Sequence, residues 1–336
     1  MSITAAVVIV ALALWVTAEV FLLAFASVLI AIFLRAVAQP LVRLTHMPMR
    51  LVLALLLLAI IAIVALIGIL MGPPLVAQFA QLQEKLPEAI DSLGKSGWGG
   101  AILQELPIIG HGRGANALSG SVLSQVGAAL STVADIVAHG VFLLFTALFF
   151  AFNPDIYVRG AMRLFPPASR NRVRNLAEAL NEALRNWLIG QFVSMCIVGV
   201  MVGVGLWILG MPLALLLGFL AFAFEFIPIV GPILAAVPGV LVATTESITM
   251  ALVVAGLYAV VQIIENNVLI PIIQQRMVYV PPAIVLIATF VAALLFGFVG
   301  VLVATPLLAA IFVVIKVLYV EDVLHEPIHL PHGFKS

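Results

Sequence analysis

Charged residues are scarce in this chain. Only 9% of its 336 residues are Asp, Glu, Lys or Arg, and 64% are hydrophobic, whereas a soluble domain carries about 25% charged residues. A chain with so few charges could not cover the surface of a soluble globule. The composition therefore predicts an all-α polytopic membrane protein, because helices satisfy their own backbone hydrogen bonds in lipid.

The chain also has no formal net charge and only one cysteine. Fifteen basic residues balance fifteen acidic ones, so no excess of positive charge is available to bind nucleic acid. The single cysteine, Cys196, can form neither an internal disulfide nor a zinc site of several cysteines. The GxSxG and GxxxxGK(S/T) motifs are also absent. We expect no enzyme activity, no cofactor, no metal and no nucleic-acid partner, and the lipid bilayer as the first partner.

Long runs without any charge set the predicted membrane segments. Residues 186–224 and 277–315 each form an uncharged run of 39 residues. One helix of that length would measure roughly 58 Å, nearly twice the thickness of a bilayer core. Each run must therefore turn back or break inside the membrane. The residues that favour breaks are Gly210-Met211-Pro212 in the first run and Gly297 and Gly300 in the second.

These breaks and the polar stretches divide the chain into six expected regions. The N-terminal membrane helices occupy 1–74, with two short helices that meet near Glu19 and a span that ends at Gly72-Pro73-Pro74. The other regions are an external amphipathic and loop region at 75–127, a span at 128–153, a cytoplasmic amphipathic helical region at 154–186, a membrane core at 187–320 with broken helices at 213–244 and 281–318, and a cytoplasmic tail at 321–336.

The distribution of Lys and Arg predicts the orientation. The 35–50 loop and the 155–185 stretch are rich in Arg, which places both on the cytoplasmic side, whereas 75–125 carries more acids than bases and is expected outside. Both termini are then cytoplasmic, and the N-terminus is expected to be a retained helix rather than a signal peptide. Within 155–185 an apolar stripe that includes Leu176 and Leu180 predicts a helix that packs on the bundle or lies at the membrane interface, or one that gates or couples transport.

The segment from Glu225 to Pro232 holds the most informative motif. Pro228 and Pro232 lack N–H groups, and Gly231 permits unusual backbone angles. Together they predict a helix interruption at membrane depth beside a buried acid. Such interruptions line the substrate and ion sites of secondary transporters. The alternative is a packing kink in which a neighbouring helix satisfies Glu225.

A second polar motif lies in the last turns of the 248–270 span. Gln262, Glu265 and Asn266 are spaced to share one helix face, and the motif continues through Asn267 to Pro271. Such a face could bind a cation or hydrogen-bond a polyol. The alternatives are a clamp between helices, a cytoplasmic end cap, or an ion pair between Glu265 and Arg276.

Two weaker patterns complete the candidate residues. The broken segments match at an offset of 69 residues, which pairs Gly231 with Gly300 and indicates either an internal repeat or chance matching among Ala, Leu and Val. Asp135 and His139 lie one helical turn apart and could relay a proton, or form a hydrated pair at the membrane interface.

The motifs taken together resemble a known family. Glu225-Phe226-Ile227-Pro228-Ile229-Val230-Gly231-Pro232 is similar to the E-x-I-P-x-x-G-P element of the autoinducer-2 exporter (AI-2E) family, also called the PerM-like permeases. The stretch from Gln262 to Pro271 resembles the next element of that family, and Gly297-Phe298-Val299-Gly300 followed by Ala304-Thr305-Pro306-Leu307 resembles its C-terminal pattern. Gln274-Gln275-Arg276 departs from the family pattern, which would place a Met-Gly-type element there.

The resemblance implies a transporter of the bacterial inner membrane with about eight membrane segments. It also implies a homo-oligomer, with a pentamer as one expectation, and links members to export of autoinducer-2 in quorum sensing or to sodium or lithium/proton antiport. We expect a transport pathway for a small polar solute, with antiport of a monovalent cation and a proton or a non-transporting membrane scaffold as alternatives. The pathway residues would be Glu225, Pro228, Gly231, Pro232, Gln262, Glu265, Asn266, Asn267, Pro271, Gly297 and Gly300.

Overall fold

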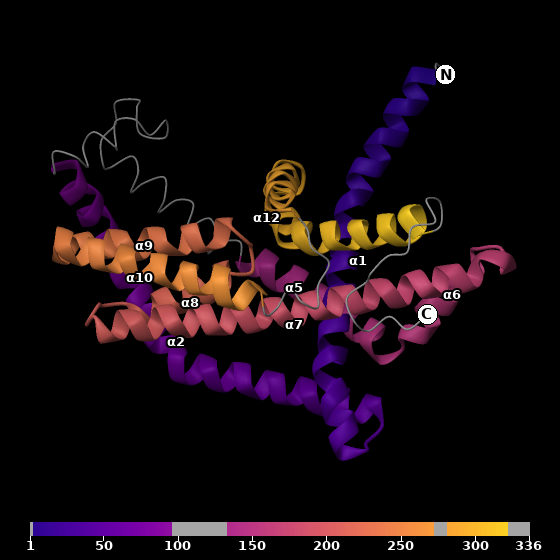
Figure 1. Ribbon diagram of the computed structural model, residues 1–336, viewed down its shortest axis with the longest axis horizontal. Helices are drawn as coiled ribbons and strands as arrows, with labels where there is room; N and C mark the ends of the chain where they lie inside the picture. Colours follow the sequence, from indigo (N-terminus) through magenta and orange to yellow (C-terminus); the bar gives the residue numbers. More distant parts are fainter. Residues whose placement is uncertain (1–2, 96–132, 272–280, 322–336) are drawn as a thin grey trace. The chain divides into compact units, whose positions relative to one another are not determined.

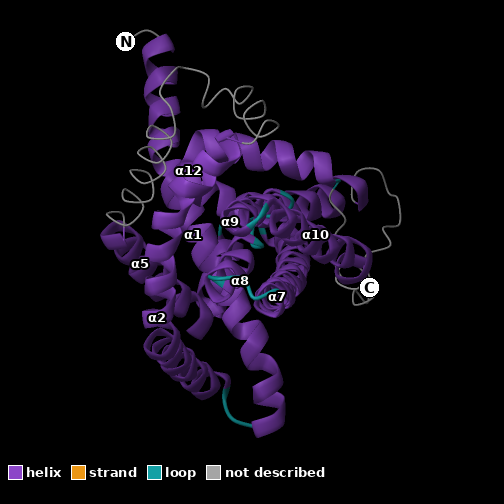
Figure 2. Cartoon of the chain, turned by 90° about the vertical axis from the view of Figure 1, so that its left-hand side faces the viewer, coloured by secondary structure: helices purple, strands orange, loops and turns teal. Residues whose placement is uncertain are grey.

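The computed structural model describes residues 3–95, 133–271 and 281–321, and within these residues the regular structure is entirely helical (Figures 1 and 2). Among the described residues, four helical segments are long and apolar enough to cross a membrane: Val20–Thr45, Pro167–Ile208, Ile248–Leu269 and Pro282–Tyr319. A bent pair, Phe142–Phe152 with Pro154–Arg163, makes a fifth candidate, and shorter apolar helices accompany them. The predicted all-α polytopic membrane fold is confirmed.

The chain folds into two compact units. The first contains residues 1–60, 139–191 and 272–336, and the second contains residues 61–138 and 192–271. The helices are α1 (Ile3–Thr45), α2 (Met49–Lys95), α5 (Val133–Phe152), α6 (Pro154–Arg163), α7 (Arg170–Ile208), α8 (Ala214–Phe224), α9 (Val230–Glu246), α10 (Ile248–Ile264) and α12 (Pro282–Ile315). A 3₁₀ turn at Pro167–Ser169 precedes α7, and π-helical turns follow α10 at Glu265–Leu269 and α12 at Lys316–Glu321.

Two predicted helix ends are wrong. The pair of short helices expected to meet near Glu19 is one continuous helix, α1, because Glu is a good helix former and the first proline of α1 is Pro40. Gly72-Pro73-Pro74 does not end the next helix either, since α2 continues to Lys95. A proline removes one hydrogen bond and can kink a membrane helix without ending it.

The first unit is held together by small residues and two arginine contacts. Ala38 of α1 and Ala151 of α5 are fully buried in a cluster that also contains Leu53 of α2. Arg35 donates to the carbonyl oxygen of Ala151 at 2.7 Å, and Arg50 donates to the side-chain oxygen of Asn153 at 2.8 Å. These bonds satisfy groups at the end of α5, where carbonyls have no partner within the helix.

The predicted apolar stripe at the start of α7 also packs within the first unit. Leu176, Ala179 and Leu180 contact Val313 and Val317 at the end of α12 and in the turn after it. The expectation that this amphipathic helix packs on the bundle is therefore confirmed, and the same helix continues without a break into the span that ends at Ile208.

Gly297 breaks α12 into two arms, as the sequence predicts. Its backbone angles, φ 59° and ψ −143°, are not helical. Figure 1 shows the two arms running in different directions. Glycine takes such a positive φ without the steric penalty that other residues meet.

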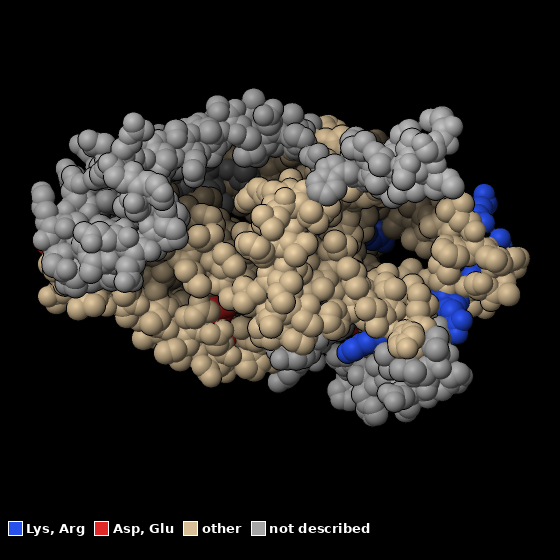
Figure 3. Space-filling view, turned by 90° about the horizontal axis from the view of Figure 1, so that it is seen from above, with Lys and Arg blue, Asp and Glu red and all other residues tan. Residues whose placement is uncertain are grey.

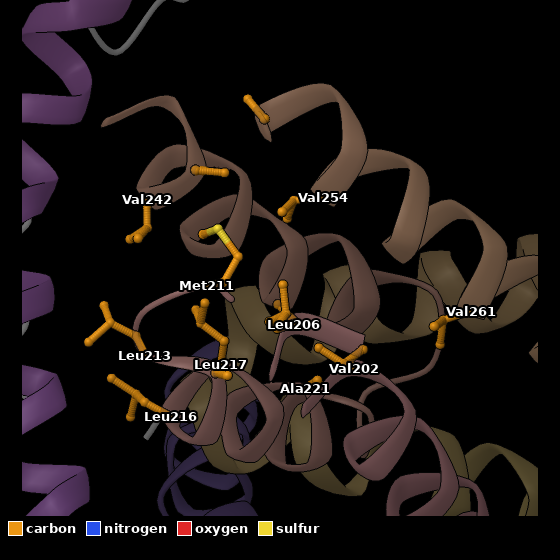
Figure 4. Packing of buried hydrophobic residues seen from close by; sticks show 14 of the residues in the cluster. Val202, Leu206, Met211, Leu213, Leu216, Leu217, Ala221, Val242, Val254 and Val261 are labelled. Atoms are coloured by element: carbon orange, nitrogen blue, oxygen red, sulfur yellow. The ribbon is translucent and has the colours of Figure 1, made fainter. Parts of the chain in front are cut away.

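The second unit packs α7, α8, α9 and α10 around one apolar core. Figure 4 shows Val202 and Leu206 of α7, Leu217 of α8 and Val254 of α10 converging in this core. The break predicted at Gly210-Met211-Pro212 separates α7 from α8. Leu213, which precedes α8, has no side-chain cap, and the amide of Leu216 instead donates to the side-chain oxygen of Gln78 on α2 at 2.9 Å. That bond satisfies one of the free N–H groups at the start of α8.

Glycines bring α7 and α8 into close contact. A Cβ placed on Gly218 of α8 would lie 2.7 Å from the Cα of Gly203 on α7, and one placed on Gly199 would lie 2.6 Å from the Cβ of Phe222. Gly199 and Gly203 are spaced as in the small-xxx-small motifs that let membrane helices approach closely.

We predict that Gly218→Ala lowers the stability of the protein. The added methyl meets backbone rather than a movable side chain, so α7 and α8 must separate, at a cost of about 1–3 kcal/mol. Thermal unfolding of the purified protein in detergent measures the change. Gly256→Ala on α10 is the control, because a Cβ there meets nothing within 4 Å. Equal melting temperatures for the two variants would contradict the close contact.

Candidate functional site

The predicted interruption between α8 and α9 is present and contains a tight turn. α8 ends at Phe224 and α9 begins at Val230. Between them, the amide of Val230 donates to the carbonyl oxygen of Pro228 at 2.8 Å, and Ile229 has φ 71° and ψ −52°. This is the geometry of a γ-turn, which is rare and strained. A β-branched residue with positive φ is unusual, and such strain is concentrated at functional sites.

Gly231 allows the chain to reverse at this point. Its amide donates to the carbonyl oxygen of Ile227 at 2.8 Å. A Cβ at Gly231 would collide with the backbone carbonyl of Phe224, at the end of α8. The two arms can therefore meet this closely only with glycine at this position. Gly300 repeats the arrangement in α12, where a Cβ would collide with the carbonyl of Ala292.

The structure brings the two acids of the two motifs together. Glu225, at the end of α8, and Glu265, directly after α10, are only 2% and 7% exposed. Their carboxyl groups lie within hydrogen-bonding reach of one another, and the side-chain amide of Gln262 donates to Glu265 at 2.8 Å. A hydrogen bond between two carboxyl groups requires a proton on one of them, because two carboxylates at this distance repel each other.

A cavity of about 520 Å³ within the second unit is lined by Glu225 of this pair. Its polar lining residues in the described structure are Glu225, Gln262 and Tyr258. The rest of its wall is apolar and comes from α7, α8, α9 and α10, with Val202, Ala221, Pro232, Val240 and Ala259 among the lining residues. Volumes of 300–1,000 Å³ with a few polar groups in an apolar wall are typical of small-molecule sites.

Tyr258 is a cavity residue that the sequence analysis missed. It lies one turn before Gln262 on α10, and its ring packs against Gly239 of α9, where a Cβ would lie 2.7 Å from the phenol oxygen. The hydroxyl is buried and makes no hydrogen bond within the described residues. Its spacing of four residues from Gln262 is the signal that could have found it.

Other predicted pathway residues are exposed and are not among those that line this cavity. Asn266 and Asn267 are exposed, and Asn267 donates to the carbonyl oxygen of Ile263 at 2.8 Å. The shared face expected for Gln262, Glu265 and Asn266 is interrupted because Glu265–Leu269 is π-helical, and a wider turn shifts Asn266 from its place above Gln262. Pro271 is exposed at the end of this segment. Arg276, the predicted ion-pair partner of Glu265, lies outside the described residues.

The remaining candidates belong to other parts of the chain. Gly297 and Gly300 lie in α12 of the first unit. Asp135 and His139 lie on α5, and their side chains are outside the described part of the structure. No group of three or more His, Cys, Asp or Glu side chains suited to a metal ion occurs among the described residues.

We predict that Tyr258→Phe maintains or raises stability. A buried hydroxyl without a partner costs about 1–3 kcal/mol, so its removal should increase the free energy of unfolding by about 1 kcal/mol. Thermal or denaturant unfolding in detergent measures the change. A loss of stability in the Phe variant would instead show that the hydroxyl is bonded.

Comparison with known proteins assigns this chain to a family. Residues 4–319 match the family described as AI-2E family transporters. The Mycobacterium tuberculosis protein MT0215 is 33% identical over 53% of this chain and 49% of its own length, and YrrI of Bacillus subtilis is 32% identical over 44% and 42%. The chain thus spans about half the length of these relatives. YueF of Bacillus subtilis is 25% identical over 85% of this chain and 82% of its own. The chain belongs to the AI-2E family of membrane transporters.

Proposed function

We propose that this transporter moves a small polar solute through the cavity of the second unit, and that the Glu225–Glu265 pair couples this movement to protons. The single observation that carries the proposal is the close approach of two nearly buried carboxyl groups beside an interrupted helix, one of them in the wall of a cavity. Ionisable residues inside a membrane are costly, and they typically mark proton relays and substrate paths.

The chemistry of the pair supports proton coupling. With one proton, the pair carries a single negative charge and holds itself together by a hydrogen bond. Loss of that proton leaves two carboxylates that repel each other in an apolar wall. A solute that donates hydrogen bonds, or an incoming cation, would stabilise the separated carboxylates. Gln262 donates a hydrogen bond to Glu265 and can orient it toward either partner.

A small polar solute suits the size and lining of the cavity. About 520 Å³ can accommodate a molecule with several hydroxyl groups, and the carboxyl and amide groups can hydrogen-bond to it at one end. The family name makes autoinducer-2 the first solute to test. The relatives named above are described as transport proteins, and their names state no substrate.

Exchange of a monovalent cation for a proton is the second candidate. The observation that favours it is the oxygen-rich character of the paired carboxyl groups next to Gln262. Hard cations such as sodium and lithium prefer oxygen ligands. In this version the pair holds either the proton or the cation, and no organic solute crosses.

We predict that Glu225→Gln abolishes coupled transport and preserves the fold. The Gln amide can still donate to Glu265, so the contact survives without an exchangeable proton. Purified protein in liposomes would be given autoinducer-2 on one side, with an imposed pH or sodium gradient. We expect solute flux that follows the pH gradient in the wild type and falls to the level of empty vesicles in the variant.

Glu246→Gln is the matched control, since Glu246 is an exposed acid at the end of α9 in the same unit. It should transport as the wild type does. Proton and sodium exchange without solute flux would support the second candidate and overturn the first. Full flux in a correctly folded Glu225→Gln variant would exclude the carboxyl pair from the mechanism.

A further inference from the structure

Four arginines line a groove between α6 and α7 in the first unit. Arg159 and Arg163 lie one turn apart on α6, and Arg170 and Arg174 lie one turn apart on α7. Together with Met162 and Asn171 they enclose a volume of about 290 Å³. Figure 3 shows Lys and Arg atoms gathered in one region of a face that is otherwise mostly uncharged.

The groove has a strong excess of positive charge. All four arginines are exposed, and within the described residues none of them forms an ion pair with an acidic side chain. Their recorded bonds are local, from Nε of Arg159 to the carbonyl oxygen of Asp155 at 3.0 Å and from Nε of Arg170 to that of Phe165 at 3.3 Å. These bonds use the Nε atoms of Arg159 and Arg170 and leave their terminal guanidinium nitrogens available to bind a ligand. Like charges one turn apart repel each other, so an anion in the groove would relieve the repulsion.

The surroundings of the groove match the surface of a bilayer. α6 turns by 81° from α5, a helix apolar enough to enter the membrane, and α6 has no buried residue. The chain then passes through Leu164 and Phe165, which are 85% and 44% exposed. A helix that leaves a membrane span at nearly a right angle, with basic side chains followed by exposed apolar ones, is suited to the level of lipid headgroups.

We propose that the α6–α7 groove binds the phosphate of an anionic phospholipid. Arginine guanidinium groups form paired, charge-assisted hydrogen bonds to phosphate oxygens, and Asn171 adds a neutral donor. The exposed Leu164 and Phe165 are placed to contact the acyl chains, which free phosphate lacks. Recruitment of such a lipid would fix the bend between α5 and α6 at the membrane surface.

Native mass spectrometry of the whole protein in detergent tests the proposal, with phosphatidylglycerol, phosphatidylcholine and inorganic phosphate as probes. We expect phosphatidylglycerol to bind more tightly than phosphatidylcholine. In the variant Arg163→Gln/Arg174→Gln, affinity for phosphatidylglycerol should fall by about thirtyfold, given the attraction of each basic side chain to an anionic headgroup. Arg163→Lys/Arg174→Lys should retain part of the affinity, because it keeps the charge and loses the paired geometry.

The matched control is Arg43→Gln/Lys316→Gln, which removes the same charge elsewhere in the first unit. This control should bind phosphatidylglycerol as the wild type does. An equal loss of affinity in the control would overturn the site, because general electrostatic attraction would then explain binding. Equal affinity for the two lipids would also overturn it, and so would equally tight binding of inorganic phosphate, which would show that the groove takes free phosphate instead.

Discussion

Polar groups that enter a membrane must find partners inside the protein, and this constraint governs the second unit. The helix is interrupted between α8 and α9, so the backbone groups at the break need local hydrogen bonds. The turn from Phe224 to Gly231 supplies them. Glu225 lies at the start of that turn with almost no exposure. Its carboxyl group reaches that of Glu265, directly after α10, and Glu225 itself lines the cavity. Interruption, acid pair and cavity therefore depend on one another.

The two units share one structural device. In each, an apolar segment begins near a proline, and a break divides it into two helical arms. A Cβ added to the glycine just after the break would collide with a backbone carbonyl of the first arm. Gly231 and Gly300 occupy matching positions at the offset of 69 residues. The structural agreement supports an internal repeat. Glu225 has no acidic counterpart, because Leu294 occupies the matching position, so the carboxyl pair is specific to the second unit.

The sequence predicted those features that depend on local chemistry. The breaks at Gly210 and at Gly297 follow from glycine and proline in uncharged runs too long for one span, and the break at Pro228 follows from the two prolines and the glycine of its motif. The helix end predicted at Gly72-Pro73-Pro74 from local sequence was wrong, because a membrane helix tolerates proline and α2 continues through these residues. It also could not show the π-helical turn at Glu265–Leu269, because such a turn is a product of packing.

No sequence pattern could predict the pairing of Glu225 with Glu265. The two residues are far apart in the chain, at the ends of α8 and α10, and they meet only because the helices of this unit pack together. Infrared spectroscopy of the purified protein in D₂O tests this pair most directly. A carboxyl group that holds a proton has a C=O band distinct from the bands of a carboxylate. We predict such a band in the wild type at neutral pH, its loss in both Glu225→Gln and Glu265→Gln, and its retention in Glu246→Gln. A wild type without the band, or a band that survives both substitutions, would contradict a shared proton at the centre of this transporter.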